Sequence, residues 1–265
     1  MSPVFERILA GTDGSDTAWL ALAHAADLAE RLDAELTVVS AHSAERSEGG
    51  SASVPEPEAV IAGAALRDVE SAYRSRVRLR TRAARGSAAD VLVHLAETEG
   101  HDLIVVGNRG LTGTSWLHPA SIPGRVSHRA PVAVLIVDTV GRQEPGYRRI
   151  LAGTDGSATA AKAVEAGRAL AEDLGAELAL ATASGSETSG RRTLEALGAA
   201  WPGVPAHVVS GDPVQALGDL AESGGYDLLV VGNKGMGGPR RILGSVPAKL
   251  ARRGSISLLI VNTAG

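Results

Sequence analysis

The sequence of 265 residues contains no cysteine, and Phe, Trp and Tyr together make up only 3% of it. The missing cysteine excludes disulfides, thiol catalysis and cysteine-ligated zinc. The scarcity of aromatic residues argues against single-strand nucleic-acid binding, which relies on stacking platforms. The core must therefore be built mainly from Ala, Val, Leu and Ile.

The chain also lacks an excess of positive charge and a long apolar run. Its net charge is −4, so a nucleic-acid partner, which needs a basic face, is not expected. No apolar run approaches the about 18 residues of a membrane helix. Glu6, Arg7 and Asp13 interrupt the N-terminal apolar run, unlike in a signal peptide. We expect a cytoplasmic protein with no membrane partner, and the spacing of the histidines predicts no metal site.

An internal repeat organises the sequence. The segment RILAGTDGS at residues 7–15 recurs without change at 149–157, and the apolar segment 132–137 corresponds to 256–261. The period is far too long for a solenoid, so it indicates a duplicated domain. We expect one domain at residues 1–140 and a second at 147–265.

Each repeat alternates predicted strands and helices, which favours a parallel sheet covered by helices on both faces. In the first repeat we expect strands near 7–11, 35–40, 77–83, 102–106 and 132–137, with helices near 16–32, 58–74, 87–99 and 121–128. The second repeat follows the same order. With strand order 3-2-1-4-5, strands one and four are neighbours at the switch point, where ligands bind.

A glycine loop follows the fourth strand in each repeat. Residues 105–110 read Val-Val-Gly-Asn-Arg-Gly, and residues 230–235 read Val-Val-Gly-Asn-Lys-Gly. Ser121 and Ser245 then stand at expected helix N-caps, with a proline in the first turn. Glycines and a helix N-terminus form a typical phosphate cradle. The alternative is an ordinary tight turn with a serine cap.

The turn after the first strand offers a second wall for the same site. Asp13 and Asp155 suit ribose hydroxyls, or else the aspartate or Ser15 caps the following helix. Alanines at the end of strand two line a base pocket or belong to the core, and Arg109 and Lys234 contact phosphates or are solvated. The candidate ligand-contacting residues are Gly11, Thr12, Asp13, Ala41, Gly107, Arg109, Gly110, Ser121, Ile122, Gly153, Thr154, Asp155, Ala183, Gly232, Asn233, Lys234, Gly235, Gly244, Ser245 and Val246.

Signals of catalysis are missing from the sequence. It contains neither a GxSxG nor a GxxxxGK[ST] motif, and no acid–base pair stands out around the predicted crevice. We therefore predict binding without dedicated catalysis, and no catalytic residue is assigned.

Together these motifs resemble the universal stress protein family in its tandem two-domain form. The family motif is Gly-x2-Gly-x9-Gly-(Ser/Thr), which binds ATP phosphates in that family. Gly232, Gly235, Gly244 and Ser245 match it with eight residues in place of nine, whereas the first repeat has Ala120 at the third glycine. The Thr-Asp-Gly-Ser turns at 12–15 and 154–157 also resemble the family.

The resemblance implies two Rossmann-like domains of the adenine-nucleotide α-hydrolase-like type, each a five-stranded parallel sheet of order 3-2-1-4-5. It implies ATP as the ligand, with or without Mg, and a nucleotide-dependent stress-response regulator. Family members pair through strand five, so it also implies an intrachain pseudo-dimer, with a homodimer as a further option. A slow ATPase, a cyclic-AMP binder and a scaffold with vestigial pockets are the alternatives.

The two predicted sites are not equal. Ala120 places a methyl group where backbone should approach a phosphate, and Pro119 removes a donor. We expect the second site to bind ATP more tightly than the first.

Overall fold

The computed structural model describes residues 3–42, 57–108, 121–141, 144–198, 203–233, 245–253 and 256–263. The first half of the chain contains β1 (Arg7–Gly11), α1 (Asp16–Leu32), β2 (Glu35–His42), α2 (Pro57–Tyr73), β3 (Arg78–Arg85), α3 (Ala88–Glu99), β4 (Leu103–Gly107), α4 (Ile122–Arg129) and β5 (Ala133–Val137). The second half contains β6 (Arg149–Gly153), α5 (Ala158–Leu174), β7 (Glu177–Ala183), α6 (Glu187–Gly198), β8 (Ala206–Val209), α7 (Pro213–Ser223), β9 (Leu228–Gly232), α8 (Ser245–Arg253) and β10 (Ser257–Val261).

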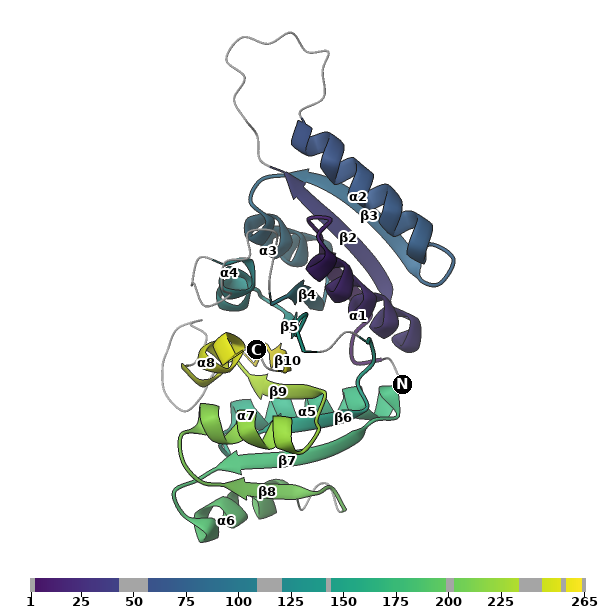
Figure 1. The fold of residues 1–265 in the computed structure, drawn as a ribbon. Coiled ribbons are helices and arrows are strands. Elements are labelled where there is room, and N and C mark those ends of the chain that lie inside the picture. The colour runs from purple at the N-terminus through teal and green to yellow at the C-terminus, as the bar shows by residue number, and fades with distance from the viewer. Residues whose placement is uncertain are drawn as a thin grey trace.

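All of these strands belong to one ten-stranded sheet in the order β3-β2-β1-β4-β5-β10-β9-β6-β7-β8 (Figure 1). Neighbours within each half are parallel, whereas β5 and β10 are antiparallel. Read from its outer edge inward, each half therefore has the predicted order 3-2-1-4-5, and the predicted fold class is confirmed. The domain limits 1–140 and 147–265 stay a prediction.

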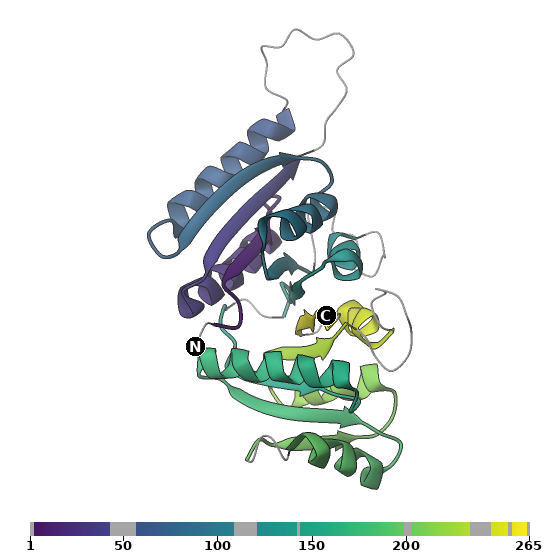
Figure 2. The ribbon, with the colours of Figure 1, turned by 180° about the vertical axis from the view of Figure 1, so that it is seen from behind.

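Helices cover both faces of the sheet, as Figures 1 and 2 show from opposite sides. Successive strand residues point to opposite faces, so Ile8 and Ala10 belong to one core cluster and Leu9 to the other. The first cluster packs under α1, α2, α5 and α6, and the second packs under α3, α4, α7 and α8. Each cluster contains residues from both halves of the chain, so the core runs through the whole sheet.

Local sequence sets the limits of α1, which coincide with the predicted helix 16–32. The Ser15 hydroxyl accepts a hydrogen bond from the backbone N–H of Ala18 and so caps the first turn. Asp33 ends the helix in the left-handed region at φ 52°, a conformation that Asp and Asn tolerate better than most residues. Buried residues such as Leu22 and Leu28 lie on the face toward the sheet.

The two halves join where β5 and β10 pair. Leu135 lies opposite Leu259, and Ile136 lies opposite Leu258. All four side chains are almost fully buried. The strand-five pairing that the family resemblance implies is therefore present within this chain, and it leaves neither strand as an exposed apolar edge.

Contacts of α5 with the N-terminal segment and with α1 reinforce this junction on the face of the first cluster. The backbone N–H of Val4 donates to Asp173 Oδ2 over 2.8 Å, and the Arg31 guanidinium donates to the carbonyl of Leu174. Tyr147, in the connection between β5 and β6, is fully buried, and its ring lies 5.3 Å from that of His24. The connection itself thus packs into the core.

The outer strand β3 carries charge along its exposed side. Arg78, Arg80 and Arg82 alternate with residues that face α2. They form ion pairs with Asp33, Glu35 and Glu99, respectively. A charged edge strand opposes pairing with other sheets.

Truncation at the junction tests whether the halves are one folding unit. We expect Leu135→Ala to lower the free energy of unfolding by about 2–5 kcal/mol, because it leaves a cavity in the continuous core. Denaturant unfolding followed by circular dichroism should show one shifted transition. The control Ile61→Ala removes a side chain that is 62% exposed and should change the free energy by no more than about 0.5 kcal/mol. Equal effects of the two substitutions would contradict the assignment.

Candidate functional site

The first and fourth strands of each half end side by side. In the first half Ile8 pairs with Leu103 and Ala10 with Val105, in parallel. The second half repeats this pairing between β6 and β9. The turns that follow these strands therefore leave the same edge of the sheet, at the predicted switch point.

The turn after β1 is held by its own side chains. The Thr12 hydroxyl accepts from the backbone N–H of Gly14 over 3.1 Å. Asp13 Oδ1 accepts from the N–H of Ser15 over 3.0 Å and from its hydroxyl over 2.6 Å. Ser15, and not Asp13, caps α1. One carboxylate oxygen of Asp13 therefore orients the capping serine, and the side chain remains partly exposed.

The second half repeats this turn. Thr154 accepts from Gly156 over 3.1 Å, and Asp155 Oδ1 accepts from Ser157 over 2.9 Å. Ser157 caps α5. Gly14 and Gly156 adopt φ values of 78° and 80°, which explains why glycine follows each aspartate.

Gly11 and Gly153 serve helix packing. A Cβ added at Gly11 would lie 3.2 Å from Leu92 Cδ1 of α3, and one at Gly153 would lie 3.3 Å from Leu217 Cδ1 of α7. The missing side chain lets each helix approach the sheet closely. The expectation that these glycines also leave room for a ligand stays a prediction.

The glycine loops begin at the predicted positions. Gly107 ends β4 opposite Val137, and Gly232 ends β9 opposite Val261. Five predicted ligand-contacting residues lie outside the described part of the chain: Arg109, Gly110, Lys234, Gly235 and Gly244.

Both loops lead into a helix at the expected serine. Ser121 has extended dihedral angles (φ −64°, ψ 155°), and its hydroxyl accepts from the N–H of Gly124 over 3.3 Å, with Pro123 in the first turn. The predicted N-cap is therefore confirmed. In the second half α8 begins at Ser245 itself. Ile122, in the first turn of α4, is 39% exposed.

The predicted residues at the end of strand two lie farther along the same edge. Ala41 pairs with Ala84 of β3, and Ala183 pairs with Val209 of β8. Both alanines are partly buried, so each is placed where either a pocket wall or a core residue would stand. Val246 is also partly buried and packs against the second core cluster.

The asparagine after the first loop glycine of each half has a structural role that the sequence did not predict. Asn233 was predicted to contact the ligand, and Asn108 was given no role. Asn108 Oδ1 accepts from the N–H and the hydroxyl of Thr139, just past β5. Asn233 Oδ1 accepts in the same way from Thr263, just past β10. The sequence feature that indicates this role is the recurrence of Val-Val-Gly-Asn in both halves, together with a threonine two residues after the end of each strand five.

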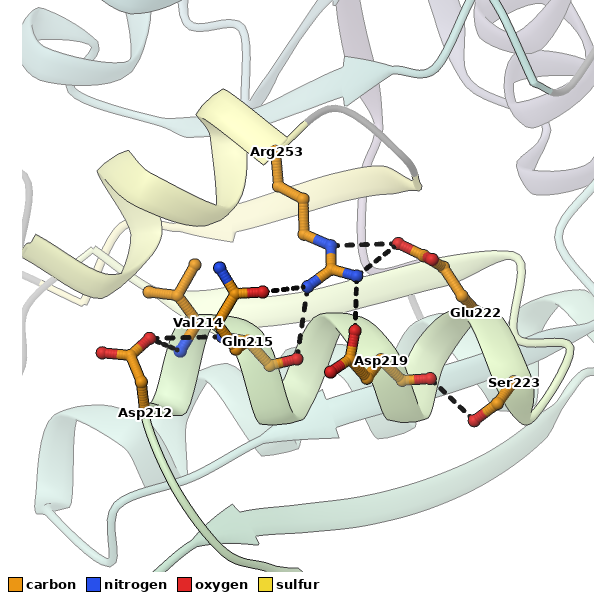
Figure 3. A network of polar contacts seen from close by, with 7 residues as sticks. All are labelled: Asp212, Val214, Gln215, Asp219, Glu222, Ser223 and Arg253. Atoms are coloured by element: carbon orange, nitrogen blue, oxygen red, sulfur yellow. Dashed lines mark hydrogen bonds and ion pairs between the residues drawn. The ribbon is translucent and has the colours of Figure 1, made fainter.

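Arginines fasten the helices that follow the glycine loops. Figure 3 shows Arg253, at the end of α8, above α7. Its guanidinium donates to Gln215 Oε1 over 3.0 Å, to Asp219 Oδ1 over 2.6 Å and to Glu222 Oε1 over 3.0 Å. This network fixes the direction of α8 relative to α7.

The first half uses a smaller version of the same clamp. Arg125 and Arg129 of α4 both donate to Asp90 of α3. The hydrogen bonds from Ser87, Arg129 and Arg125 hold the pKa of the Asp90 carboxyl well below its usual range. The clamp therefore stays charged at neutral pH.

Within the described residues, no three His, Cys, Asp or Glu side chains gather in a way that would hold a metal ion. Among the helices seen in this part of the chain, none is both long and apolar enough to cross a bilayer.

Comparison with known proteins identifies the family. The model of the universal stress protein family matches residues 5–138 and 184–262. The chain belongs to the universal stress protein family. Universal stress protein Rv1636 of Mycobacterium tuberculosis is 36% identical over 143 residues, which cover 51% of this chain and 97% of that relative. This coverage agrees with a duplicated unit.

Two solved structures match the chain over nearly its whole length. A universal stress protein from Archaeoglobus fulgidus aligns with 98% of this chain and 97% of its own, at 20% identity and a TM-score of 0.73. A putative universal stress protein from Pseudomonas aeruginosa covers 97% and 93%, at 16% identity and a TM-score of 0.72. At these identities the likeness establishes the tandem fold.

The positive-φ glycines in the aspartate turns give a test of the turn geometry. We expect Gly14→Ala and Gly156→Ala each to cost about 1–2 kcal/mol of stability, since both require positive φ. Gly156→Ala should cost more, because its Cβ would lie 2.9 Å from Thr193 Cγ2, against 3.4 Å to Ala65 Cβ at Gly14. Thermal or denaturant unfolding measures both.

A control glycine lies inside α2. A Cβ at Gly63 would lie 3.6 Å from its closest neighbour, Arg67 Nη1, so Gly63→Ala should stabilise the protein by up to about 1 kcal/mol. A stability loss from Gly156→Ala no larger than that from Gly63→Ala would refute the requirement for a residue with positive φ in this turn.

Proposed function

We propose that this universal stress protein binds an adenine nucleotide, ATP in the first place, at the edge of the sheet where strands one and four of each half end. The observation that carries the proposal is that, in both halves, the strand before the aspartate turn pairs with the strand that ends at the first loop glycine. Two different recognition elements, a carboxylate and a phosphate cradle, then face one ligand.

The residues present fit the parts of ATP. Asp13 and Asp155 would accept hydrogen bonds from the ribose hydroxyls. The loops after Gly107 and Gly232, with the helix N-termini at Ser121 and Ser245, would hold the phosphates through N–H groups and the helix dipole. The alanines Ala41 and Ala183 would lie beside the base. Magnesium, where present, would be bound mainly by the phosphates.

We assign the protein a regulatory role rather than a dedicated catalytic one. The carboxylate of Asp13 is committed in part to orienting Ser15, and the sequence contains no His-x-Gly-His signature of adenylyl-transferring relatives. Nucleotide binding would then act through conformation and through a protein partner. A homodimer would have to use a surface other than strand five, because β5 and β10 already pair within the chain.

The nucleotide that copurifies with the protein tests the proposal. We expect mass spectrometry of the extracted ligand to show ATP. Bound ADP, with turnover that Gly235→Asp abolishes, would favour a slow ATPase instead. Finding cyclic AMP in the extract would mean that cyclic AMP, and not ATP, is the ligand. A protein that carries no nucleotide and does not bind added nucleotide would favour a scaffold.

Substitution of the two aspartates tests the inequality of the sites. Titration calorimetry of the wild type should give a tight site and a weak site. Asp155→Ala should weaken the tight one, and Asp13→Ala the weak one, each by about tenfold for a lost hydrogen bond to a charged group. The exposed neighbour Asp16 provides the control Asp16→Ala, which should leave both affinities unchanged. Two equal sites, or a tighter first site, would refute the prediction.

A further inference from the structure

A buried asparagine connects the base of each glycine loop to the end of strand five in the same half. Asn108 is 2% exposed. Its backbone N–H donates to Val137 over 2.9 Å, its Nδ2 donates to Asp138 Oδ1 over 3.2 Å, and its Oδ1 accepts from Thr139. A shift of the loop at Asn108 therefore changes the hydrogen bonds of Asp138.

The equivalent bonds recur in the second half. The backbone N–H of Asn233 donates to Val261 over 2.9 Å, and its Nδ2 donates to Asn262 Oδ1 over 3.0 Å. Its Oδ1 accepts from the backbone N–H of Thr263 over 3.0 Å. Asn262 thus stands in the second half where Asp138 stands in the first.

From these two positions the bonds cross to the other half. The backbone N–H of Asp138 donates to Ser257 Oγ over 3.1 Å, and Ser257 is the first residue of β10. In return, Asn262 Nδ2 donates to the carbonyl of Pro131, which lies two residues before the start of β5. Ser257, at 1% exposure, is as buried as the apolar core, so water does not compete for its bond.

The residues that receive the crossing bonds, Ser257 and Pro131, each follow one of the helices that begin after the glycine loops. Because β5 and β10 are antiparallel, the strands of the two halves run in opposite directions. The candidate sites, which lie at the carboxyl ends of the strands, are therefore at opposite ends of the strands. The helix α8 starts at the second site and returns to the edge of the first, where Ser257 follows it. Likewise α4 starts at the first site, and Pro131 follows its end. Each relay thus joins the base of one site's loop to the chain segment that follows the other site's helix.

We propose that these two relays, Asn108–Asp138–Ser257 and Asn233–Asn262–Pro131, couple the two nucleotide sites of the chain. The proposal rests on the nucleotide binding proposed above. Asn108 and Asn233 act as positioning residues for the loops. A phosphate held by one loop fixes its asparagine, which in turn fixes the segment that follows the helix of the other site.

Whether the coupling is positive or negative depends on which arrangement of the loops makes the hydrogen bonds of the two relays. A ligand that fixes one loop favours the arrangement in which both relays are intact, and this same arrangement places the other helix for its ligand. Binding at one site therefore raises the affinity of the other, and linkage requires the effect to be equal in both directions.

The repeat itself supplies substitutions that cut only the crossing bonds. Asn262→Asp introduces the residue found at Asp138, keeps an oxygen for Asn233 and loses the donor to Pro131. Ser257→Ala introduces the residue found at Ala133 and removes the acceptor for Asp138. Ser257→Ala leaves the bonds of Asn108 and Asn233 within their own halves intact, and Asn262→Asp keeps an acceptor for Asn233 Nδ2.

A matched control removes a buried serine hydroxyl that does not cross the junction. Ser127 is 8% exposed, and its hydroxyl donates to the carbonyl of Pro123 within α4. Ser127→Ala introduces the residue found at Ala251 in the second half. Any general effect of losing a buried hydroxyl will appear in this variant as well.

Native mass spectrometry of the full chain titrated with ATP measures the coupling. It resolves the chain with no, one or two nucleotides bound, which gives both stepwise association constants of the wild type. Gly110→Asp and Gly235→Asp each place a side chain and a negative charge in one phosphate loop and so close that site, which gives the association constant of the remaining site. The product of the stepwise constants divided by the product of the single-site constants is the coupling factor.

We expect a coupling factor of about five or more in the wild type, within the usual range for allosteric sites. It should fall toward one in the combined variant Ser257→Ala and Asn262→Asp, and stay at the wild-type value in Ser127→Ala. A merely structural role would lower the melting temperature and leave the factor unchanged. A wild-type factor of one, or a factor that survives in the folded combined variant, would overturn the coupling.

The test also distinguishes a wild type that binds no nucleotide from one that binds without coupling, and it has a substitute measurement for a combined variant that does not fold. If the wild type binds no nucleotide, the proposed function fails, and the coupling fails with it, whereas binding with a factor of one overturns the coupling alone. If the combined variant does not fold, amide exchange in Gly235→Asp, in which the second site is closed, replaces it. ATP bound at the first site should slow exchange in β10, and Ser257→Ala should abolish that effect; unchanged exchange in β10 would overturn the proposal.

Discussion

The antiparallel pairing of β5 with β10 is the contact on which the rest of this structure depends. It joins two parallel sheets into one and buries Leu135 against Leu259. Both core clusters contain residues of the two halves, so the core is continuous across this pairing. It also removes two apolar edges, leaving β3 and β8 as the outer strands. Because the pairing is antiparallel, it places the two candidate sites at opposite edges of the sheet.

The site depends on a second constraint, which is the strand order inside each half. Strands one and four lie far apart in sequence and adjacent in space. This order makes the strand before the aspartate turn and the strand before the glycine loop neighbours, so both carboxyl ends lie side by side. The helices beyond the loops are then held from behind, by Arg253 on α7 in one half and by Arg125 and Arg129 on Asp90 in the other. The scaffold thus fixes the direction of the helix N-termini through charge-assisted bonds.

Several residues around the candidate site, most of them predicted to contact the ligand, also hold the scaffold. Gly11 and Gly153 admit leucines of α3 and α7. Asn108 and Asn233 tie the loop bases to the ends of β5 and β10. Asp13 orients the serine that caps α1. In a fold that binds ligands at strand ends, the residues nearest the ligand must also end the strands and start the helices, so both demands fall on the same few positions.

The sequence by itself determined the repeat, the order of strands and helices and the family motifs. The limits of α1 followed from the Ser15 cap and from helical spacing, which are local. The position of Ser121 at the start of α4 was predicted for the same reason. The roles of Asn108, Ser257 and Asn262 were decided only by the tertiary structure, because their partners lie in other strands or in the other half of the chain. A sequence motif records spacing along one segment, whereas a buried hydrogen bond across β5 and β10 depends on how distant segments pack.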